Sequence, residues 1–422
     1  MARSGTRTPR LFLLTPVGSA GDVHPFIGIG RELRYRGHEV TLLAGEAFRA
    51  AAEDAGLDFV ATWTAEEFQA LTERPGLWHP RRGLELVLGA VAEGLRSTYA
   101  ALTRLHRPGR TVLVGHTLSL ATRTFTEKHQ VPAATLHLAP SLLRSVHLTP
   151  AIPPGRDISW LPHPIRRALF WAVDRWLVDP HIVPELNRWR RELDLPPVRR
   201  PFDEWLHAPD LTVGLFPDWF APPQPDWPPQ VRLTGFPLFD AGEDAPLEPR
   251  LQEFLAAGQP PLVLTPGSAN RQASGFFDAG IQAVTSLGRR AIVLTRYPDQ
   301  LPTPLPDSLL HVDWASLARL LPRCSALLHH GGIGTSARGL AAGIPQLVMP
   351  MGFDQPDNAV RLRRLNVGEL IAPNRFTPRH VEETLRRLLS SPATAAACRR
   401  YRDAIGGTSG IGATCDLLES LG

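Results

Sequence analysis

The sequence predicts an α/β fold built from two doubly wound, Rossmann-like domains that face each other across a cleft. Residues 10–44 and residues 261–295 carry the prediction. Each stretch shows an apolar strand, a loop of small residues, a helical spacing of apolar side chains and a second apolar strand. This succession is typical of a parallel sheet with helices on its faces. The length of 422 residues fits two domains. In such sheets ligands bind beyond the carboxyl ends of the strands.

Short apolar runs bounded by turn-forming residues predict the positions of the strands. In the first half they are expected at residues 10–15, 38–44, 57–61, 111–115 and 133–138. In the second half they are expected at residues 261–265, 291–295, 326–329 and 346–349. Helical spacing predicts helices at residues 26–35, 165–193, 275–287, 334–343 and 358–365.

A proline-dense stretch at residues 216–237 marks the end of the first domain. Proline at this density cannot lie in a helix or a central strand, so we expect an ordered path along the surface. The first domain is therefore expected at residues 1–237, followed by a linker at 238–249 and the second domain at 250–394. Residues 395–422 have helical spacing and are expected to return to the first domain.

Composition excludes several classes of protein. The three cysteines, Cys324, Cys398 and Cys415, are too scattered for a disulfide framework or a CxxC metal site, which indicates a reducing cytosol. No apolar run is long enough to span a membrane, and the apolar stretch at residues 11–14 is too short for a signal peptide. The net charge is +4 without any basic run, so no nucleic-acid partner is expected. A weakly positive surface favours anionic ligands or an anionic membrane face.

The segment LLHHGGIGTS, residues 327–336, gives the clearest indication of a binding site. A strand runs into a glycine-rich turn, and a helix begins near Gly334, so backbone amides and the positive helix end face a bound anion such as a diphosphate. Gly331 and Gly332 allow close approach, while His330 and Thr335 add hydrogen-bonding groups. Two alternatives stay open, an ordinary tight turn and a metal site. Adjacent histidines point to different faces and no further ligand follows at a suitable spacing, so we expect no metal.

This segment, together with the loop at residues 18–25, resembles the inverting nucleotide-sugar glycosyltransferases of the GT-B fold, the UDP-glycosyltransferase superfamily. The resemblance covers nearly the whole chain. It implies that His330 contacts the donor diphosphate, with Gly331, Gly332, Gly334 and Thr335 around it.

The same resemblance assigns other donor contacts. Asp354 and Gln355 match a pair that binds sugar hydroxyls, and Trp314 matches an aromatic side chain that stacks on the base. Ser268 and Gly21 match residues close to the phosphates. Alternatively, Trp314 is a core or cleft-wall aromatic residue, and Asp354 is a helix N-cap.

One departure from the family concerns the ribose. Arg338 stands where many members carry a glutamate that binds the ribose hydroxyls, and arginine cannot accept a hydrogen bond. The donor nucleotide therefore stays open between dTDP and UDP. No cofactor is expected beyond this nucleotide-sugar co-substrate.

A catalytic base must remove a proton from the acceptor hydroxyl. Asp22 aligns with the base position of the family and is preferred over His24, two residues further along the chain. His116, after the fourth expected strand, matches the partner that holds the base. Alternatively, Asp22 only caps the helix that follows. His24 and His116 are then structural polar residues at strand ends whose hydrogen bonds are made within the protein.

The acceptor is expected to be a hydrophobic molecule that carries a hydroxyl. The helical stretch at residues 165–189 is rich in aromatic side chains, among them Phe170 and Trp171, which we predict to bind the acceptor. An ordinary packed helix pair is the alternative. Residues 18–28 and 215–240 resemble the catalytic subunit of rhamnolipid-forming rhamnosyltransferase. That resemblance implies transfer of L-rhamnose from dTDP-rhamnose to a lipid-like 3-(3-hydroxyalkanoyloxy)alkanoate.

We therefore expect a metal-independent, inverting glycosyltransferase in the cytoplasm, with peripheral contact at the inner membrane face left open. Two alternatives remain. One is a natural-product glycosyltransferase that uses a UDP- or dTDP-sugar on a polyketide, sterol or flavonoid. The other is a non-catalytic partner subunit, which has no need to keep His330, Asp354 and Gln355. A nucleotide-sugar epimerase is disfavoured because it would not need the apolar stretch of the first domain.

Overall fold

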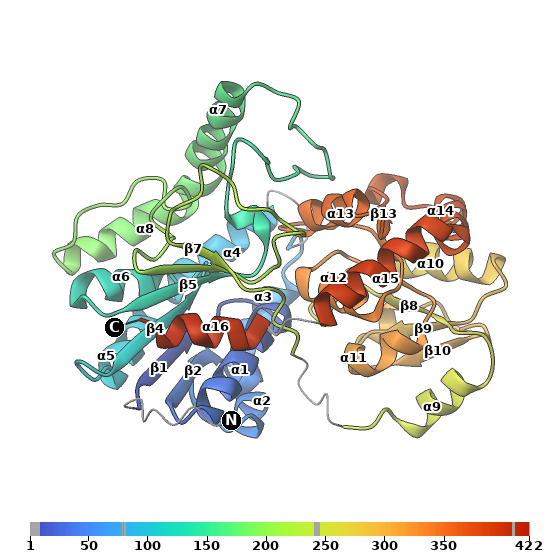
Figure 1. Ribbon diagram of the computed structural model, residues 1–422, viewed down its shortest axis with the longest axis horizontal. Helices are drawn as coiled ribbons and strands as arrows, with labels where there is room; N and C mark the ends of the chain where they lie inside the picture. Colours follow the sequence, from blue (N-terminus) through green and yellow to red (C-terminus); the bar gives the residue numbers. More distant parts are fainter. Residues whose placement is uncertain (1–8, 78, 80–81, 240–244, 407–409, 422) are drawn as a thin grey trace.

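The computed structural model describes residues 9–421 except 78, 80–81, 240–244 and 407–409. It contains two parallel sheets, each flanked by helices and lying next to the other along the long axis of the molecule (Figure 1). The first sheet has the strand order β3-β2-β1-β4-β5-β6-β7 and the second has the order β10-β9-β8-β11-β12-β13. The predicted pair of Rossmann-like α/β domains is confirmed.

The elements of the first half surround the seven-stranded sheet. They are β1 (Leu11–Thr15), α1 (Ala20–Tyr35), β2 (Glu39–Gly45), α2 (Arg49–Asp54), β3 (Asp58–Trp63), α3 (Ala65–Glu73), α4 (Arg82–Glu93), α5 (Leu95–Leu105), β4 (Thr111–His116), α6 (Leu120–His129), β5 (Ala133–His137), α7 (His163–Val173), α8 (Asp179–Glu192), β6 (Leu211–Gly214) and β7 (Val231–Leu233). A π-helical turn, Asp174–Val178, joins α7 to α8 without a break.

The elements of the second half surround the six-stranded sheet, and the last helix leaves it. They are α9 (Pro249–Ala256), β8 (Leu262–Thr265), α10 (Ser274–Ser286), β9 (Ala291–Leu294), β10 (Leu309–Val312), α11 (Leu317–Leu320), β11 (Ala326–His329), α12 (Ile333–Ala342), β12 (Gln346–Val348), α13 (Gln355–Arg364), β13 (Gly368–Leu370), α14 (Pro378–Ser390), α15 (Pro392–Gly406) and α16 (Gly410–Glu419).

The central strands form where the sequence is continuously apolar, because helices cover both faces of each sheet. All five residues of β1 are buried, and β1 pairs in parallel with β2 and β4, with Leu11 opposite Glu39 and Thr111. The short strands β6, β7, β10 and β13 were not predicted, since three or four residues give little periodicity. β7 lies at the edge of its sheet, where the neighbouring prolines are tolerated.

The first helix begins six residues before the predicted start. Ser19 is its N-cap and Asp22 is the third helical residue, and the two side chains form a capping box that stabilises a start at Ala20. Pro25 consequently lies inside the helix, where it has no N–H to donate to the carbonyl of Gly21. The expected start at residue 26 was wrong because the capping box outweighs the proline.

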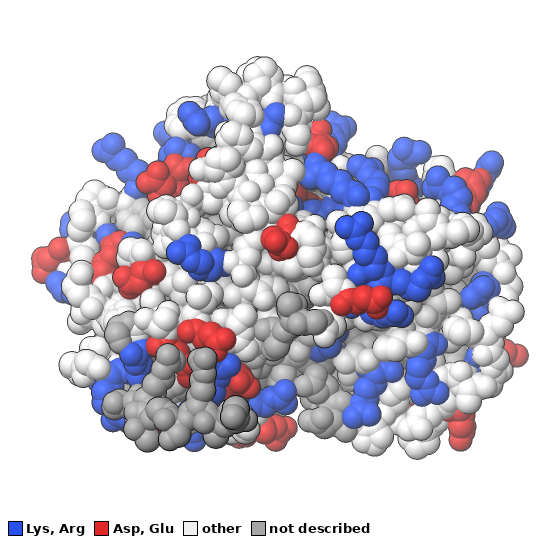
Figure 2. All heavy atoms as spheres, viewed as in Figure 1, with Lys and Arg blue, Asp and Glu red and all other residues white. Residues whose placement is uncertain are grey.

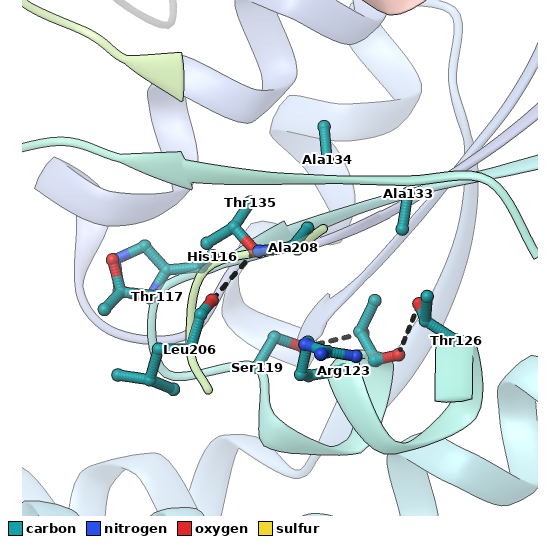
Figure 3. Close-up of a pocket in the computed structure, with 12 residues that line it drawn as sticks. His116, Thr117, Ser119, Arg123, Thr126, Ala133, Ala134, Thr135, Leu206 and Ala208 are labelled. Atoms are coloured by element: carbon teal, nitrogen blue, oxygen red, sulfur yellow. Dashed lines mark hydrogen bonds between the residues drawn. The ribbon is translucent and has the colours of Figure 1, made fainter. Parts of the chain in front are cut away.

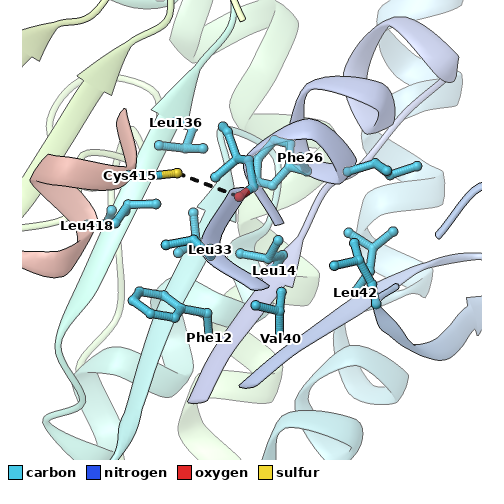
Figure 4. Close-up of a cluster of buried hydrophobic side chains, with 14 of the residues drawn as sticks. Phe12, Leu14, Phe26, Leu33, Val40, Leu42, Leu136, Cys415 and Leu418 are labelled. Atoms are coloured by element: carbon cyan, nitrogen blue, oxygen red, sulfur yellow. Dashed lines mark hydrogen bonds between the residues drawn. The ribbon is translucent and has the colours of Figure 1, made fainter. Parts of the chain in front are cut away.

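The C-terminal helix α16 packs on α1 of the first domain. Cys415 and Leu418 lie in the same buried cluster as Phe12 and Leu14 (Figure 4), and the Cys415 thiol lies 3.6 Å from the carbonyl oxygen of Ile29. The chain thus ends on the domain in which it began. Residues 240–244 of the predicted linker lie outside the described residues, and the domain limits stay predictions.

Within the described part of the chain, no helix is long and apolar enough to cross a membrane. The three cysteines are all buried with free thiols.

Candidate active site

Asp22 stands at the start of α1, just beyond the carboxyl end of β1. Its Oδ2 accepts hydrogen bonds from the backbone N–H of Ser19 (2.8 Å) and from the Ser19 hydroxyl (3.2 Å). Gly18 has a φ of +135°, and a Cβ atom there would lie 2.2 Å from Asp22 Oδ2, so only glycine fits. Burial raises the pKa of Asp22 to about 6, against the lowering effect of the two hydrogen bonds from Ser19.

His116 faces the other oxygen of this carboxylate. It is the last residue of β4, and its Nε2 lies 3.8 Å from Asp22 Oδ1. The backbone N–H of Leu118 donates to His116 Nδ1 at 3.3 Å, so the neutral ring carries its proton on Nε2, toward Asp22. Burial lowers the pKa of His116 to about 4, which keeps the ring neutral near pH 7. The structure therefore brings Asp22 and His116 together, with Asp22 Oδ1 left to take a proton.

His24 is held elsewhere. Two residues along a helix correspond to a turn of about 200°, so His24 leaves α1 on nearly the opposite side from Asp22. Its ring lies edge-on to Phe48 (6.3 Å between centroids) and Phe239 (6.4 Å). The structure does not bring His24 to the Asp22–His116 pair.

A polar layer lies behind His116. Figure 3 shows a small cavity between β4, β5 and α6 that is lined by hydroxyl groups, among them those of Ser119, Thr122 and Thr135. Ser119 and Thr122 are 2.8 Å apart, and Thr135 donates to the carbonyl of Leu206 at 3.0 Å. These three hydroxyl groups are therefore satisfied, and the cavity supports the end of β4. Arg123 also lines it, and the Nη1 of Arg123 is buried without a hydrogen-bond partner in the described part of the chain.

The glycine-rich turn of the second domain joins β11 to α12. Gly331 has a φ of +96°, and Gly332 is the N-cap of α12. The ring of His330 lies against Gly267 and Gly332. A Cβ atom added to Gly267 would lie 2.8 Å from the ring, and one added to Gly332 would lie 2.5 Å from it. His330 Nδ1 is buried and has no hydrogen-bond partner in the described part of the chain. Burial lowers the pKa of His330 to about 4, so the ring is a neutral donor and acceptor at the mouth of α12.

Asp354 and Gln355 open α13 and have different surroundings. Gln355 Oε1 accepts from the backbone N–H groups of Met351 (2.7 Å) and Gly352 (3.0 Å), so this oxygen braces the preceding loop. Asp354 forms no side-chain capping hydrogen bond, although it stands at the N-cap position. Burial raises the pKa of Asp354 to about 7, and the negative charge of Asp22 adds to that rise. The charge of Asp22 in the first domain thus acts on Asp354 in the second.

Asn358, one turn further along α13, was missed by sequence reasoning. Its side-chain amide donates to the carbonyl of Gly331 at 3.0 Å and to Asp354 Oδ2 at 2.7 Å. It thereby ties the glycine-rich turn to the start of α13. The spacing of four residues between positions 354 and 358 was the available signal, since it places both side chains on one helix face.

The remaining donor candidates follow strands of the second sheet. Trp314 lies in the loop after β10, and 40% of its surface is exposed. Ser268 is exposed after β8, Thr335 is half-buried in the first turn of α12, and Gly334 has no atom within 4 Å of a built Cβ position. These positions share the carboxyl edge of the sheet with His330.

Two family models match the chain. The model of the glycosyltransferase family 28 N-terminal domain matches residues 12–147, and that of the erythromycin biosynthesis protein CIII-like C-terminal domain matches residues 284–408. The chain is 32% identical over 430 residues to O-mycaminosyltylonolide 6-deoxyallosyltransferase of Streptomyces fradiae, with 97% of each chain covered. The chain belongs to the EryCIII-like, family 28-like glycosyltransferases.

Solved structures of glycosyltransferases have the same fold. The kitacinnamycin glycotransferase matches with a TM-score of 0.76 and 18% identity, over 98% of this chain and 99% of that one. The spinosyn rhamnosyltransferase SpnG complexed with thymidine diphosphate matches with a TM-score of 0.66 and 19% identity, over 94% and 96%. These structures show the GT-B fold, and the family models and the Streptomyces fradiae relative show a nucleotide-sugar glycosyltransferase.

In this glycosyltransferase the two predicted acceptor residues lie on α7. Phe170 is half-buried beneath the guanidinium of Arg144, 5.6 Å from its ring centroid, and Trp171 is exposed and packs edge-on against Trp176. These partners belong to α7 and the segments beside it, not to the surroundings of Asp22. A role in acceptor binding stays a prediction.

No cluster of three or more His, Cys, Asp or Glu side chains is arranged to hold a metal ion, as far as the described residues extend.

Proposed function

We propose that this glycosyltransferase moves a sugar from a dTDP-sugar to a hydroxyl of an apolar natural product, with inversion at the anomeric carbon and without a metal. The observation that carries the proposal is the pairing of Asp22 with His116 in one domain and the unpartnered His330 Nδ1 at the helix mouth of the other. A base and an anion site on two facing domains are what a single displacement requires.

Asp22 acts as the base. Its Oδ2 is held by Ser19, so Oδ1 is the oxygen that accepts the proton of the acceptor hydroxyl. The oxygen of that hydroxyl attacks the anomeric carbon while the bond to the nucleoside diphosphate breaks. The N–H of His116, directed at Oδ1, keeps the carboxylate oriented. A pKa of about 6 leaves Asp22 ionised near pH 7 and still basic enough to accept a proton.

The leaving diphosphate is stabilised by the start of α12. Backbone amides of the turn at residues 331–335 and the ring of His330 face the anion, and the helix end supplies a positive potential. Asn358 holds this turn in place through the carbonyl of Gly331. Gly21 and Ser268 complete the proposed phosphate site, Trp314 stacks on the base, and Asp354 with the amide nitrogen of Gln355 binds the sugar.

The choice of donor and acceptor rests on the relatives. By its name, the Streptomyces fradiae relative transfers 6-deoxyallose to O-mycaminosyltylonolide, and SpnG forms a complex with thymidine diphosphate. Both support a thymidine-linked deoxysugar and a macrolide-like acceptor. L-rhamnose and the lipid-like acceptor expected from the sequence stay predictions, and so do the cytoplasmic location and the peripheral membrane contact.

Calorimetric titration with dTDP and with UDP, in the presence of a chelator, tests the donor site. We expect micromolar binding with a preference for dTDP, retained in Asp22→Asn and lost in His330→Ala. His380→Ala, at a half-buried position in the first turn of α14, is the control for histidine removal. Folded wild-type protein that binds neither nucleotide would refute the donor site and favour the non-catalytic subunit.

A further inference from the structure

The helix α7 rises from the first domain and forms the top of the molecule in Figure 1. Eleven large apolar side chains are exposed among the described residues, and eight of them lie between residues 152 and 177. Six form one helical surface, which we call the α7 surface: Ile165, Leu169, Trp171, Val173, Trp176 and Leu177. Trp176, with 64% of its surface exposed, is the most accessible of the six. A patch of this density on a water-exposed helix marks an interaction site.

The continuation of this helix, α8, is equally exposed to solvent on its outer side and serves as a comparison for the α7 surface. A buried stripe runs through both halves, from Arg166 and Asp174 to Val178, Ile182 and Leu186. On the outside of α8, however, the exposed positions are prolines and charged residues: Pro180, Pro184, Arg188, Arg191 and Glu192. The apolar outer face is confined to α7 and the π-helical turn. It is therefore a local property and not a general feature of this helix.

Between residues 152 and 177, the exposed charged side chains without a described ion pair are all arginines. Arg156, Arg167 and Arg175 are exposed, and none of them forms an ion pair with a described carboxylate.

The two acidic residues of the same segment are already neutralised. Asp157 pairs with Arg364 of α13, while Asp174 is buried and pairs with Arg144 and Arg200. Figure 2 shows the top of the molecule mainly as side chains other than Lys, Arg, Asp and Glu, with both basic and acidic side chains at its edges. An apolar, tryptophan-rich face bordered by unpaired arginines is complementary to a partner that has an anionic surface and an apolar interior.

We propose that the α7 surface docks on the anionic face of a lipid bilayer. Exposed tryptophan rings partition into the headgroup region, the aliphatic side chains enter the acyl boundary, and arginines pair with anionic headgroups while their stems stay apolar. A second copy of the chain fits less well. A two-fold contact would bring Arg167 and Arg175 of both copies into one patch, while Asp157 and Asp174 are already paired and Asp179 is half-buried. The proposal does not depend on the transfer reaction, because docking needs neither donor nor base.

Flotation of the full chain with vesicles tests the proposal. The vesicles contain phosphatidylcholine alone or phosphatidylcholine mixed with phosphatidylglycerol. We expect wild-type protein to float at least about tenfold more with the mixed vesicles, and less at high salt. The double variants Leu169→Ser/Trp176→Ser and Arg167→Glu/Arg175→Glu should both lose flotation. Tyr35→Ser, an exposed aromatic residue on α1, and Arg191→Glu, on the polar half of the helix, are the matched controls and should float like wild type.

Three results would overturn the proposal. The first is equal flotation with both kinds of vesicle, or none with either. The second is flotation of both double variants at the wild-type level. The third is a wild-type dimer in sedimentation velocity that Leu169→Ser/Trp176→Ser converts to a monomer, which would assign the α7 surface to a second copy. Circular dichroism and dTDP titration of each variant show that fold and nucleotide site are intact, so the test is separate from that of the proposed function.

Discussion

The carboxylate of Asp357, on α13 of the second domain, accepts a hydrogen bond of 2.9 Å from the backbone N–H of Ala151, in the loop that follows β5 of the first domain. The other carboxylate oxygen accepts from Arg361 Nε at 2.7 Å, and Arg361 also reaches the carbonyl of Phe220. The side chains of Asp357 and Arg361 are only 3% and 5% exposed. A buried ion pair on α13, the helix whose N-cap is Asp354, thus joins the two domains.

Asp357→Ala is expected to lower the free energy of unfolding by about 3 kcal/mol, because it leaves the buried guanidinium of Arg361 unpaired. Glu383→Ala is the matched control. Glu383 pairs with Arg379 at the same spacing of four residues on the exposed face of α14, and its loss should have little effect on the free energy of unfolding. Urea unfolding of both variants checks the difference. Equal losses would mean that the Asp357 pair is no stronger than a surface pair.

The pH dependence of transfer should follow the ionisation of Asp22. Because the base must be ionised and its pKa is raised to about 6, protonation of Asp22 should lower kcat/KM about tenfold per unit well below pH 6. This step is distinct from the ionisation of Asp354, whose pKa is raised to about 7. The neutral His116 contributes no second step in this range, since its pKa is lowered to about 4. Initial rates across this range check the profile. A rate that stays level down to pH 4 would exclude Asp22 as the base.

Gly18→Ala should reduce transfer by roughly 10²-fold or more while dTDP binding stays unchanged. The new Cβ would lie 2.2 Å from Asp22 Oδ2 and would push the carboxylate away from the reacting hydroxyl. Gly37→Ala is the control that separates displacement of the Asp22 carboxylate from the backbone strain of placing alanine at a positive φ. Gly37 also has a positive φ, of +92°, but a Cβ there meets nothing within 4 Å. That control should lose about 1 kcal/mol of stability and keep its rate. Equal rates in both variants would contradict the positioning of Asp22 by Gly18.

Asp354→Asn should stabilise the protein above pH 7. Folding raises the pKa of Asp354 from 3.8 to about 7, so the folded chain holds this proton more tightly than the unfolded chain. The ionisation penalty is fully present above the folded pKa and disappears as pH falls toward the unfolded value. Allowing for solvent screening, we expect a gain on the order of 1–2 kcal/mol.

Urea unfolding of Asp354→Asn at two pH values, one above 7 and one below 3.8, measures this gain. Asparagine keeps an oxygen that can accept from Asn358, so the hydrogen bond at this position is preserved. A gain of the same size at both pH values would show that ionisation of Asp354 is not its source.

The amino-acid sequence by itself determined the α/β class, the two sheets, most of the central strands and the location of the glycine-rich turn before α12. These features depend on local information: continuous apolar runs, glycines at tight turns and the spacing of helical faces. The resemblance of the motifs at residues 18–25 and 329–358 pointed to the glycosyltransferase family for the same reason, since both motifs are contiguous.

Only the tertiary structure decided which of the candidate side chains meet. Asp22 and His116 are 94 positions apart, and they lie 3.8 Å from each other because β1 and β4 are neighbours in the sheet. His24 was an equally local candidate, yet the turn of α1 directs it to Phe48 and Phe239. The link from Ala151 to Asp357 depends on the relative position of two domains, and local periodicity carries no information about such long-range contacts.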